Sequence, residues 1–276
     1  MNDIETLNIE SKVIDVKRRL SDISIFAIDM DGTIYLGKNL FPFTKTFLDG
    51  LQNAGKDFVF LTNNSSRNAN DYFLKLRKMG LEIEKTRIYT SGDATIEYLQ
   101  ALAPGARIFL MGTNNLQDDF ANAGFILTDI DPDFVVLGYD LGFNYKKLDK
   151  ACQFIRQGVT FIATHPDLNC PLEDGKMAPD CGSLTAAIVA STGISPKVIG
   201  KPHHEMLNGL LSRTHVKKEN LCIIGDRLST DIKMGMDFGV LNVLVLTGEA
   251  KIEDLKTSSF TPDLVVKKTV DLMQYL

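Results

Sequence analysis

The stretch that decides the fold is Ser24-Ile25-Phe26-Ala27-Ile28-Asp29-Met30-Asp31-Gly32-Thr33. An apolar run bounded by turn residues is typical of a buried strand in a parallel sheet. Within a regular strand Asp29 and Asp31 would point to the same side, at the carboxyl end where open α/β sheets bind ligands. Two carboxylates this close repel each other unless a cation or a shared proton lies between them. The stretch therefore predicts either an acidic ligand site or simply a strand that ends in an Asp-Gly turn.

Further apolar runs alternate with helical patterns along the rest of the chain. The alternation predicts an α/β protein with a parallel sheet. We expect strands at 58–61, 197–199, 221–224, 243–246 and 264–266, and an inserted α/β unit from about residue 88 to 193 with strands at 107–111, 134–137 and 160–163. Ile9, Val13, Val16 and Leu20 have helical spacing, which predicts an amphipathic helix before the first strand.

Composition excludes several classes of protein. The chain has 276 residues, 44% of them hydrophobic, which is enough for one large domain or two smaller ones. Its net charge of −5 provides no electrostatic case for binding nucleic acid or an anionic membrane. We expect a cytoplasmic protein, because the N-terminus is polar and no apolar run is long enough to span a bilayer. We expect its four cysteines, which form no CxxC pair, to be reduced thiols.

Polar side chains follow several of the predicted strands, and we expect them to share one edge of the sheet. They are Asp29, Asp31, Thr62, Lys201, Asp226 and Asp231. Carboxylates with a hydroxyl and an ammonium suit a Mg²⁺ ion together with a phosphate group. The absence of a His/Cys cluster with zinc spacing disfavours zinc.

In this order, the motifs resemble those of the haloacid dehalogenase (HAD) superfamily across nearly the whole chain. The resemblance rests on Asp29-Met30-Asp31-Gly32-Thr33, on Thr62, on Lys201, and on Gly225-Asp226 with Asp231. Four further runs resemble subfamily IIA, the NagD-like and p-nitrophenyl phosphatase group: Thr62-Asn63-Asn64-Ser65, Asp131 to Val136, Cys181 to Leu184, and Gly200-Lys201-Pro202. The resemblance implies a Rossmann-like core at residues 1–88 and 192–276 and an inserted C2-type α/β cap at residues 89–191.

The resemblance also implies a reaction, namely phosphomonoester hydrolysis through an aspartyl-phosphate. Asp29 would be the nucleophile, and Asp31 would protonate the leaving oxygen and then deprotonate the attacking water. Since Asp31 is a carboxylate, the chain differs from the family's dehalogenases, phosphonatases and transport ATPases at this position. For this role Asp31 must turn away from the metal, so we expect the strand to lose its regular form before Asp31, with Gly32 supplying the backbone freedom.

The remaining motif residues take supporting roles by the same resemblance. Asp29, Asp226 and the Asp31 backbone oxygen would hold Mg²⁺, and Asp231 would be an outer-shell carboxylate. Thr62 and Lys201 would stabilise charge on the transferring phosphoryl group.

Substrate recognition is expected from Asn63, Asn64, His165 and Asp167. The family's specificity loop falls on Thr164-His165-Pro166-Asp167, where the group more often has asparagine at the position of His165. His165 could instead be an exposed loop residue without a role. The group's substrates include nucleotides, pyridoxal phosphate, glycerol phosphate and sugar phosphates, and its caps often mediate dimer contacts, so a homodimer through the cap is expected.

We therefore predict a Mg²⁺-dependent phosphatase acting on a small phosphorylated metabolite. One alternative is a non-hydrolytic phosphate-binding or regulatory protein of the same fold, although the motifs are complete. A receiver-type signalling domain is disfavoured, because such single domains are much shorter and carry no cap.

Overall fold

The computed structural model describes residues 10–171 and 176–276, which form two compact units. The first unit comprises Met1–Leu61, Lys75–Ile88 and Leu210–Leu276, and the second comprises Thr62–Leu74 and Tyr89–Gly209. The domain limits expected from the sequence differ from these units at residues 62–74 and 192–209, and they stay a prediction. The expected amphipathic helix is α2 (Glu10–Asp22), while Ile9 lies outside the described residues.

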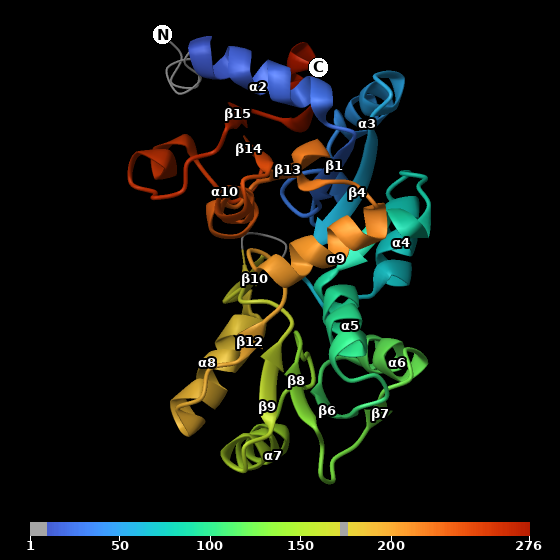
Figure 1. Cartoon of the computed structure of the whole chain (residues 1–276), viewed down its shortest axis with the longest axis vertical. Coiled ribbons are helices and arrows are strands. Elements are labelled where there is room, and N and C mark those ends of the chain that lie inside the picture. Colours follow the sequence, from blue (N-terminus) through green and yellow to red (C-terminus); the bar gives the residue numbers. More distant parts are fainter. Residues whose placement is uncertain (1–9, 172–175) are drawn as a thin grey trace. The chain divides into compact units, whose positions relative to one another are not determined.

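A six-stranded sheet with β1 in its interior organises the first unit (Figure 1). Its strand order is β15-β14-β13-β1-β4-β5. The strands are β1 (Ile25–Asp29), β4 (Asp57–Thr62), β5 (Ile88–Thr90), β13 (Leu221–Gly225), β14 (Leu241–Val245) and β15 (Leu264–Val266). The strand predicted before the Asp-Gly turn is β1, which pairs in parallel with β13 on one side and with β4 on the other. The predicted parallel sheet is confirmed.

Helices and a small hairpin connect these strands. The hairpin of β2 (Tyr35–Leu36) and β3 (Asn39–Leu40) directly follows the acidic turn after β1. The α-helices are α3 (Thr44–Asn53), α4 (Ala69–Lys78), α9 (His204–Thr214) and α10 (Lys233–Phe238). The 3₁₀-helices are η1 (Lys85–Arg87), η3 (Lys218–Asn220), η5 (Ile252–Lys256) and η6 (Thr269–Tyr275), and η4 (Leu228–Ile232) is a π-helical turn.

The second unit is built on a five-stranded sheet with the order β12-β9-β8-β6-β7. Its strands, all parallel, are β6 (Arg107–Met111), β7 (Ile126–Leu127), β8 (Phe134–Leu137), β9 (Thr160–Ala163) and β12 (Lys197–Val198). The helices are α5 (Ser91–Leu102), α6 (Asn114–Asn122), α7 (Tyr145–Arg156) and α8 (Cys181–Thr192). A hairpin of β10 (Asn169–Pro171) and β11 (Met177–Pro179) occupies the long polar segment before α8.

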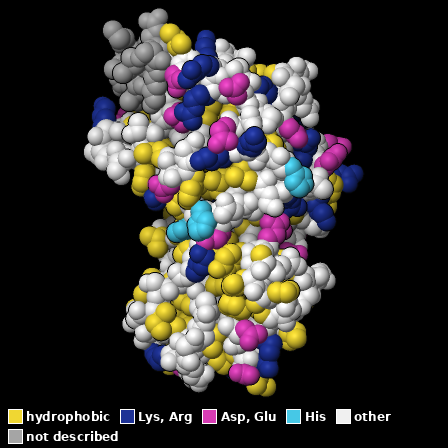
Figure 2. All heavy atoms as spheres, in the orientation of Figure 1, with side chains coloured by type: hydrophobic (Ala, Val, Ile, Leu, Met, Phe, Trp, Pro, Cys, Tyr) yellow, Lys and Arg dark blue, Asp and Glu magenta, His cyan; other side chains and the backbone are white. Residues whose placement is uncertain are grey.

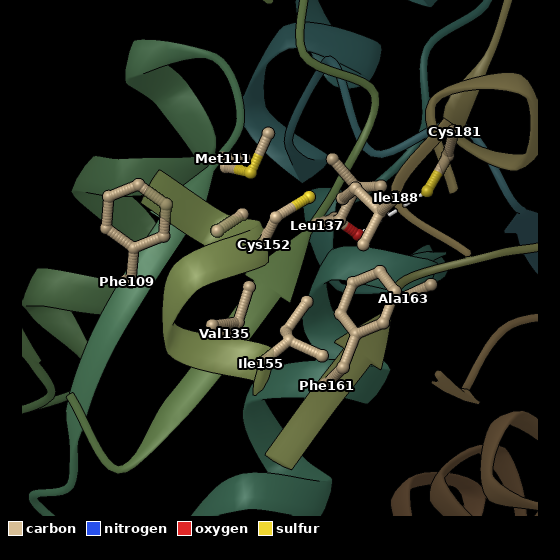
Figure 3. Packing of buried hydrophobic residues seen from close by; sticks show 11 residues of the cluster. Phe109, Met111, Val135, Leu137, Cys152, Ile155, Phe161, Ala163, Cys181 and Ile188 are labelled. Carbon is tan, nitrogen blue, oxygen red and sulfur yellow. Dashed lines mark hydrogen bonds between the residues drawn. The ribbon is translucent and has the colours of Figure 1, made fainter. Parts of the chain in front are cut away.

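Apolar side chains of α7 and α8 pack against this second sheet and form its core (Figure 3). The cluster consists of Phe109, Met111, Val135, Leu137, Ala151, Cys152, Ile155, Phe161, Ala163, Cys181 and Ile188. Alternate residues of β6, β8 and β9 contribute to it, since successive strand residues face opposite sides. Cys181, the first residue of α8, is fully buried here, and burial raises the pKa of its thiol to about 12.

The face drawn in Figure 2 is mixed in charge. Acidic and basic side chains are interspersed on it. Among the described residues, no helix combines the length and the apolar character needed to cross a membrane.

Candidate functional site

The candidate residues fall into two sets, one in each unit. The acidic set, in the first unit, contains Asp29, Asp31, Asp226 and Asp231. The amide-lysine set, in the second unit, contains Thr62, Asn63, Asn64, His165, Asp167 and Lys201.

Asp29 is the last residue of β1, at the carboxyl end of an interior strand. Ile28 pairs with Ile224 of β13 and Asp29 pairs with Leu61 of β4. The four preceding residues of β1 are buried, whereas Asp29 is partly exposed. A parallel sheet holds its interior strands on both sides, so this carboxylate is anchored by its backbone while its side chain stays accessible.

The strand ends before Asp31, as expected. Asp31 lies outside β1 and pairs with Tyr35 through an isolated β-bridge, and Gly32 adopts a φ of +86°. The Gly32 N–H donates to the Tyr35 carbonyl at 2.8 Å, which closes the turn. Because only glycine adopts this left-handed backbone without strain, the Asp-Gly sequence determines where the strand stops.

Asp226 is a buried carboxylate that lies against this turn. It follows β13, is 2% exposed, accepts a hydrogen bond from the Glu249 N–H at 2.7 Å and contacts the Thr33 hydroxyl at 3.5 Å. A Cβ atom on Gly32 or on Gly248 would lie 2.4 Å or 1.9 Å from Asp226 Oδ2. Two glycines therefore make room for this carboxylate, and the expected meeting of the first and fourth motifs at one edge of the sheet is confirmed.

Asp231 folds back onto the end of β13 from the π-helical turn η4. It is 1% exposed, and its Oδ2 lies 3.3 Å from both the Arg227 N–H and the Thr230 hydroxyl. A Cβ on Gly225 would lie 2.2 Å from its carboxyl carbon. The buried carboxylate is thus held by the loop that carries Asp226, while its outer-shell role stays a prediction.

Asn63 connects two parts of the amide-lysine set. Its Oδ1 accepts from the Lys201 N–H at 2.8 Å, and its Nδ2 donates to the Lys201 carbonyl at 2.9 Å and to Asp167 Oδ1 at 3.2 Å. One amide thereby clamps both backbone polar groups of Lys201, a residue that is 2% exposed. We call this arrangement the Asn63 clamp.

Lys201 does not follow a strand of the sheet that contains Asp29, so that expectation is wrong. The preceding strand, β12, pairs with β9 in the five-stranded sheet, and the Gly200 N–H continues this pairing by donating to the Thr164 carbonyl at 2.7 Å. A strand of two residues carries too little pattern to reveal which sheet it joins.

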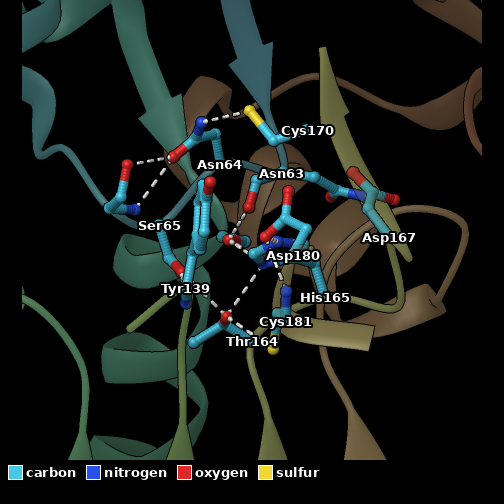
Figure 4. Close-up of polar contacts among 12 residues, drawn as sticks. Asn63, Asn64, Ser65, Tyr139, Thr164, His165, Asp167, Cys170, Asp180 and Cys181 are labelled. Carbon is cyan, nitrogen blue, oxygen red and sulfur yellow. Dashed lines mark hydrogen bonds and ion pairs between the residues drawn. The ribbon is translucent and has the colours of Figure 1, made fainter. Parts of the chain in front are cut away.

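Two further members of the amide-lysine set, Thr62 and Asn64, lie at the end of β4 and directly after it. Thr62 is the last residue of β4, and its Oγ1 accepts from the Asn64 N–H at 3.2 Å. Asn64 is partly exposed and accepts from the Ser66 N–H and hydroxyl at 2.9 Å and 2.6 Å. Its Nδ2 lies 3.8 Å from the Cys170 sulfur (Figure 4).

His165 is fully buried rather than exposed. Its Nε2 lies 2.9 Å from Asp180 Oδ1, and its Nδ1 lies 2.9 Å from the Thr164 hydroxyl and 3.5 Å from that of Ser91 (Figure 4). Neither Asp180 nor Ser91 was among the predicted site residues. Asp180 was recognisable as the N-cap before the apolar pattern of α8, a position that aspartate favours.

His165, Asp167 and Asp180 also form a group with possible metal ligands. One ligand atom from each lies within 4.8 Å of the other two. In this group the imidazole Nε2 already pairs directly with Asp180. Nearby, burial raises the pKa of Tyr139 to about 12, which keeps its hydroxyl neutral.

Comparisons with known proteins found matches over most of the chain. A family model described as haloacid dehalogenase-like hydrolase matches residues 26–126, and a HAD-hydrolase-like model matches residues 198–272. An acid sugar phosphatase of Staphylococcus aureus is 34% identical over 238 residues, which are 86% of this chain and 92% of that protein.

Solved structures of phosphatases have the same fold. A 4-nitrophenylphosphatase from Thermotoga maritima matches with a TM-score of 0.89 and 44% identity, over 93% of this chain and 98% of that one. A glycerol phosphate phosphatase from Mycobacterium tuberculosis, solved in complex with calcium, matches with a TM-score of 0.84 and 28% identity, over 92% of this chain and 76% of that one.

Proposed function

Since the chain belongs to the haloacid dehalogenase-like hydrolases, as a phosphatase of the NagD-like group, we propose that it hydrolyses small sugar-type phosphomonoesters in a Mg²⁺-dependent reaction. One observation carries this proposal: Asp29 ends an interior strand beside a turn against which the buried Asp226 is packed. The S. aureus relative named acid sugar phosphatase supports the substrate class.

In the proposed reaction Asp29 attacks the phosphorus atom. Its oxygen forms a bond to phosphorus while the bond to the leaving oxygen breaks, and Asp31 donates a proton to that oxygen. Asp31 then takes a proton from water as the water attacks the aspartyl-phosphate. Inorganic phosphate leaves, and Asp29 is regenerated as a carboxylate.

The acidic set fits a hard divalent cation. Asp29, Asp226 and the Asp31 carbonyl would supply oxygen ligands, and Gly32 and Gly248 make room for the Asp226 carboxylate beside the turn that carries Asp31. When bound, Mg²⁺ supplies positive charge that offsets repulsion between carboxylates and phosphate. Asp231 is proposed as an outer-shell carboxylate.

Phosphate and substrate contacts are proposed for the amide-lysine set. The Thr62 hydroxyl and the Lys201 ammonium would stabilise the phosphoryl oxygens. Asn64 and Asp167, which are partly exposed, are proposed to contact the substrate. Asn63 and His165 are buried with their polar atoms engaged, so we propose a different role for them below.

The relatives named as phosphatases argue against the non-hydrolytic alternative. A cytoplasmic location and a homodimer through the inserted unit stay predictions. Sedimentation of the purified protein would test the dimer.

Removing divalent metal should abolish turnover. We expect EDTA to stop phosphate release from p-nitrophenyl phosphate and from glucose 6-phosphate, and added Mg²⁺ to restore it. The carboxylates of the acidic set repel a phosphate dianion unless a cation offsets their charge. The measurement is phosphate release after exhaustive dialysis. Release that continues without metal would contradict the Mg²⁺ proposal, and a protein that binds phosphate but never releases product would support the non-hydrolytic alternative.

The glycines around Asp226 should control metal affinity. Gly248→Ala places a Cβ 1.9 Å from Asp226 Oδ2 and must displace the carboxylate, so we expect Mg²⁺ binding to weaken about 10- to 100-fold. Gly32→Ala adds strain at a φ of +86° and should lower stability as well.

Gly55→Ala is the matched control, because Gly55 has a φ of +69° and a Cβ added to it would meet no atom within 4 Å. It should lose only about 1 kcal/mol of stability, through backbone strain. Calorimetric titration measures Mg²⁺ affinity and thermal unfolding measures stability, so together they separate weaker metal binding from backbone strain. Unchanged Mg²⁺ affinity in Gly248→Ala would show that Asp226 is not a ligand.

A further inference from the structure

The imidazole of His165 is enclosed in a hydrogen-bonded network. Both ring nitrogens have partners, Asp180 at Nε2 and Thr164 at Nδ1, each at 2.9 Å. The ring is 0% exposed, and the Asp180 carboxylate that holds it is 3% exposed. A side chain with both polar atoms engaged and no exposed surface is suited to holding structure in place rather than to contacting a substrate directly.

Asp180 is itself firmly oriented. Its Oδ1 accepts from the Cys181 N–H at 2.6 Å at the start of α8, as well as contacting His165. These two contacts at one oxygen hold the Asp180 carboxylate in a fixed orientation. The orientation of the imidazole is thereby fixed from the start of α8.

Two contacts connect this histidine to the Asn63 clamp. The Ser91 hydroxyl donates to the backbone carbonyl of Asn63 and lies 3.5 Å from His165 Nδ1. Gly200, the residue before Lys201, lies in a tight space between both: a Cβ there would be 2.6 Å from Asn63 Oδ1 and 2.9 Å from His165 Cβ. The backbone at Gly200, which leads into Lys201, therefore packs against both His165 and Asn63.

We propose that His165, held by Asp180, is a positioning residue that maintains the Asn63 clamp and so fixes the backbone of Lys201. This inference rests on the proposed function, in which Lys201 stabilises the transferring phosphoryl group. A residue acting in this way changes the chemical step for every substrate alike. A residue that contacts the leaving group changes the recognition of one substrate more than another.

The test compares two substrates with different leaving groups, p-nitrophenyl phosphate and glucose 6-phosphate. We expect His165→Ala to lower kcat about 10- to 100-fold by the same factor for both, with KM changed less than about threefold, because small displacements of a catalytic group are costly. His165→Asn keeps a donor and an acceptor, so its kcat should lie between that of His165→Ala and that of the wild type. His215→Asn, at an exposed histidine with a φ of 56° that asparagine tolerates, should match the wild type.

Two results of this kinetic comparison would overturn the inference. One is a rise in KM for glucose 6-phosphate alone with kcat intact, which would show direct substrate contact. The other is wild-type kinetics in His165→Ala.

If His165→Ala fails to fold, Ser91→Ala provides a second route, because it removes the hydroxyl between His165 and Asn63. We expect its kcat loss and that of His165→Asn to be non-additive in the double variant, since both act through the clamp. Additive losses would contradict the proposed link.

Lys201→Met separates this inference from the proposed function. Near-normal activity in Lys201→Met would refute the role of Lys201 itself. An inactive Lys201→Met together with fully active His165 and Ser91 variants would refute only the positioning role. Stoichiometric Zn²⁺ binding that His165→Asn abolishes would identify a metal site at His165, Asp167 and Asp180 instead, and would overturn the inference.

Discussion

Asp29→Asn is expected to lower kcat at least about 10³-fold, because a carboxamide oxygen cannot act as the attacking nucleophile. The substitution is nearly isosteric, and Asp29 is held by backbone pairing to β4, so the fold should survive. The measurement is steady-state hydrolysis of p-nitrophenyl phosphate, with circular dichroism to verify folding.

Asp237→Asn is a suitable control for this substitution. Asp237 forms a surface ion pair with Lys233 on α10 and has no place in the proposed mechanism. It should retain wild-type kcat. Near-normal turnover in Asp29→Asn would show that the reaction does not pass through an aspartyl-phosphate at this residue.

Asp31→Asn is expected to affect the two steps of the reaction differently. The p-nitrophenolate anion leaves readily without a proton, whereas the alkoxide of a sugar needs one. The loss in kcat should therefore be about 10²- to 10⁴-fold for glucose 6-phosphate, the range typical of a lost general acid–base group. With p-nitrophenyl phosphate, attack by Asp29 should still occur. Hydrolysis of the aspartyl-phosphate should then be slow, because no base at position 31 takes a proton from the attacking water.

Rapid-mixing kinetics would reveal this slow second step as a burst. Asp31→Asn should release one equivalent of p-nitrophenolate per protein molecule and then turn over slowly. Equal losses for both substrates with no burst would indicate that Asp31 has a different task, such as ligating metal through its side chain. The structure supports the expected task, because the strand ends at Asp29 and the chain turns at Gly32.

Much of the first unit followed from local sequence patterns. The apolar run from Ile25 to Ile28 predicted β1, and the Asp-Gly pair predicted its end, because both depend on residues adjacent in the chain. Interior strands of a parallel sheet are apolar on both faces, so their signal is strong wherever they lie.

The amide-lysine set was predicted less completely. The residues were identified, but the sheet of the strand before Lys201 was not, because β12 has two residues and joins β9 instead of the first sheet. His165 was expected at a substrate or in an exposed loop, and its burial against Asp180 and Thr164 was not foreseen. No pattern along the chain specifies which polar partner a histidine meets.

By itself, the sequence determined the class of protein, the strand that carries Asp29 and the residue types required for phosphate chemistry. These depend on short-range patterns: hydrophobic alternation, turn residues and carboxylates placed directly after strands. Only the tertiary structure decided that Gly32 and Gly248 both border Asp226, and that Asn63 clamps a backbone 138 residues away. Such contacts depend on how distant segments pack, where a difference of one methyl group decides whether a carboxylate or an amide fits.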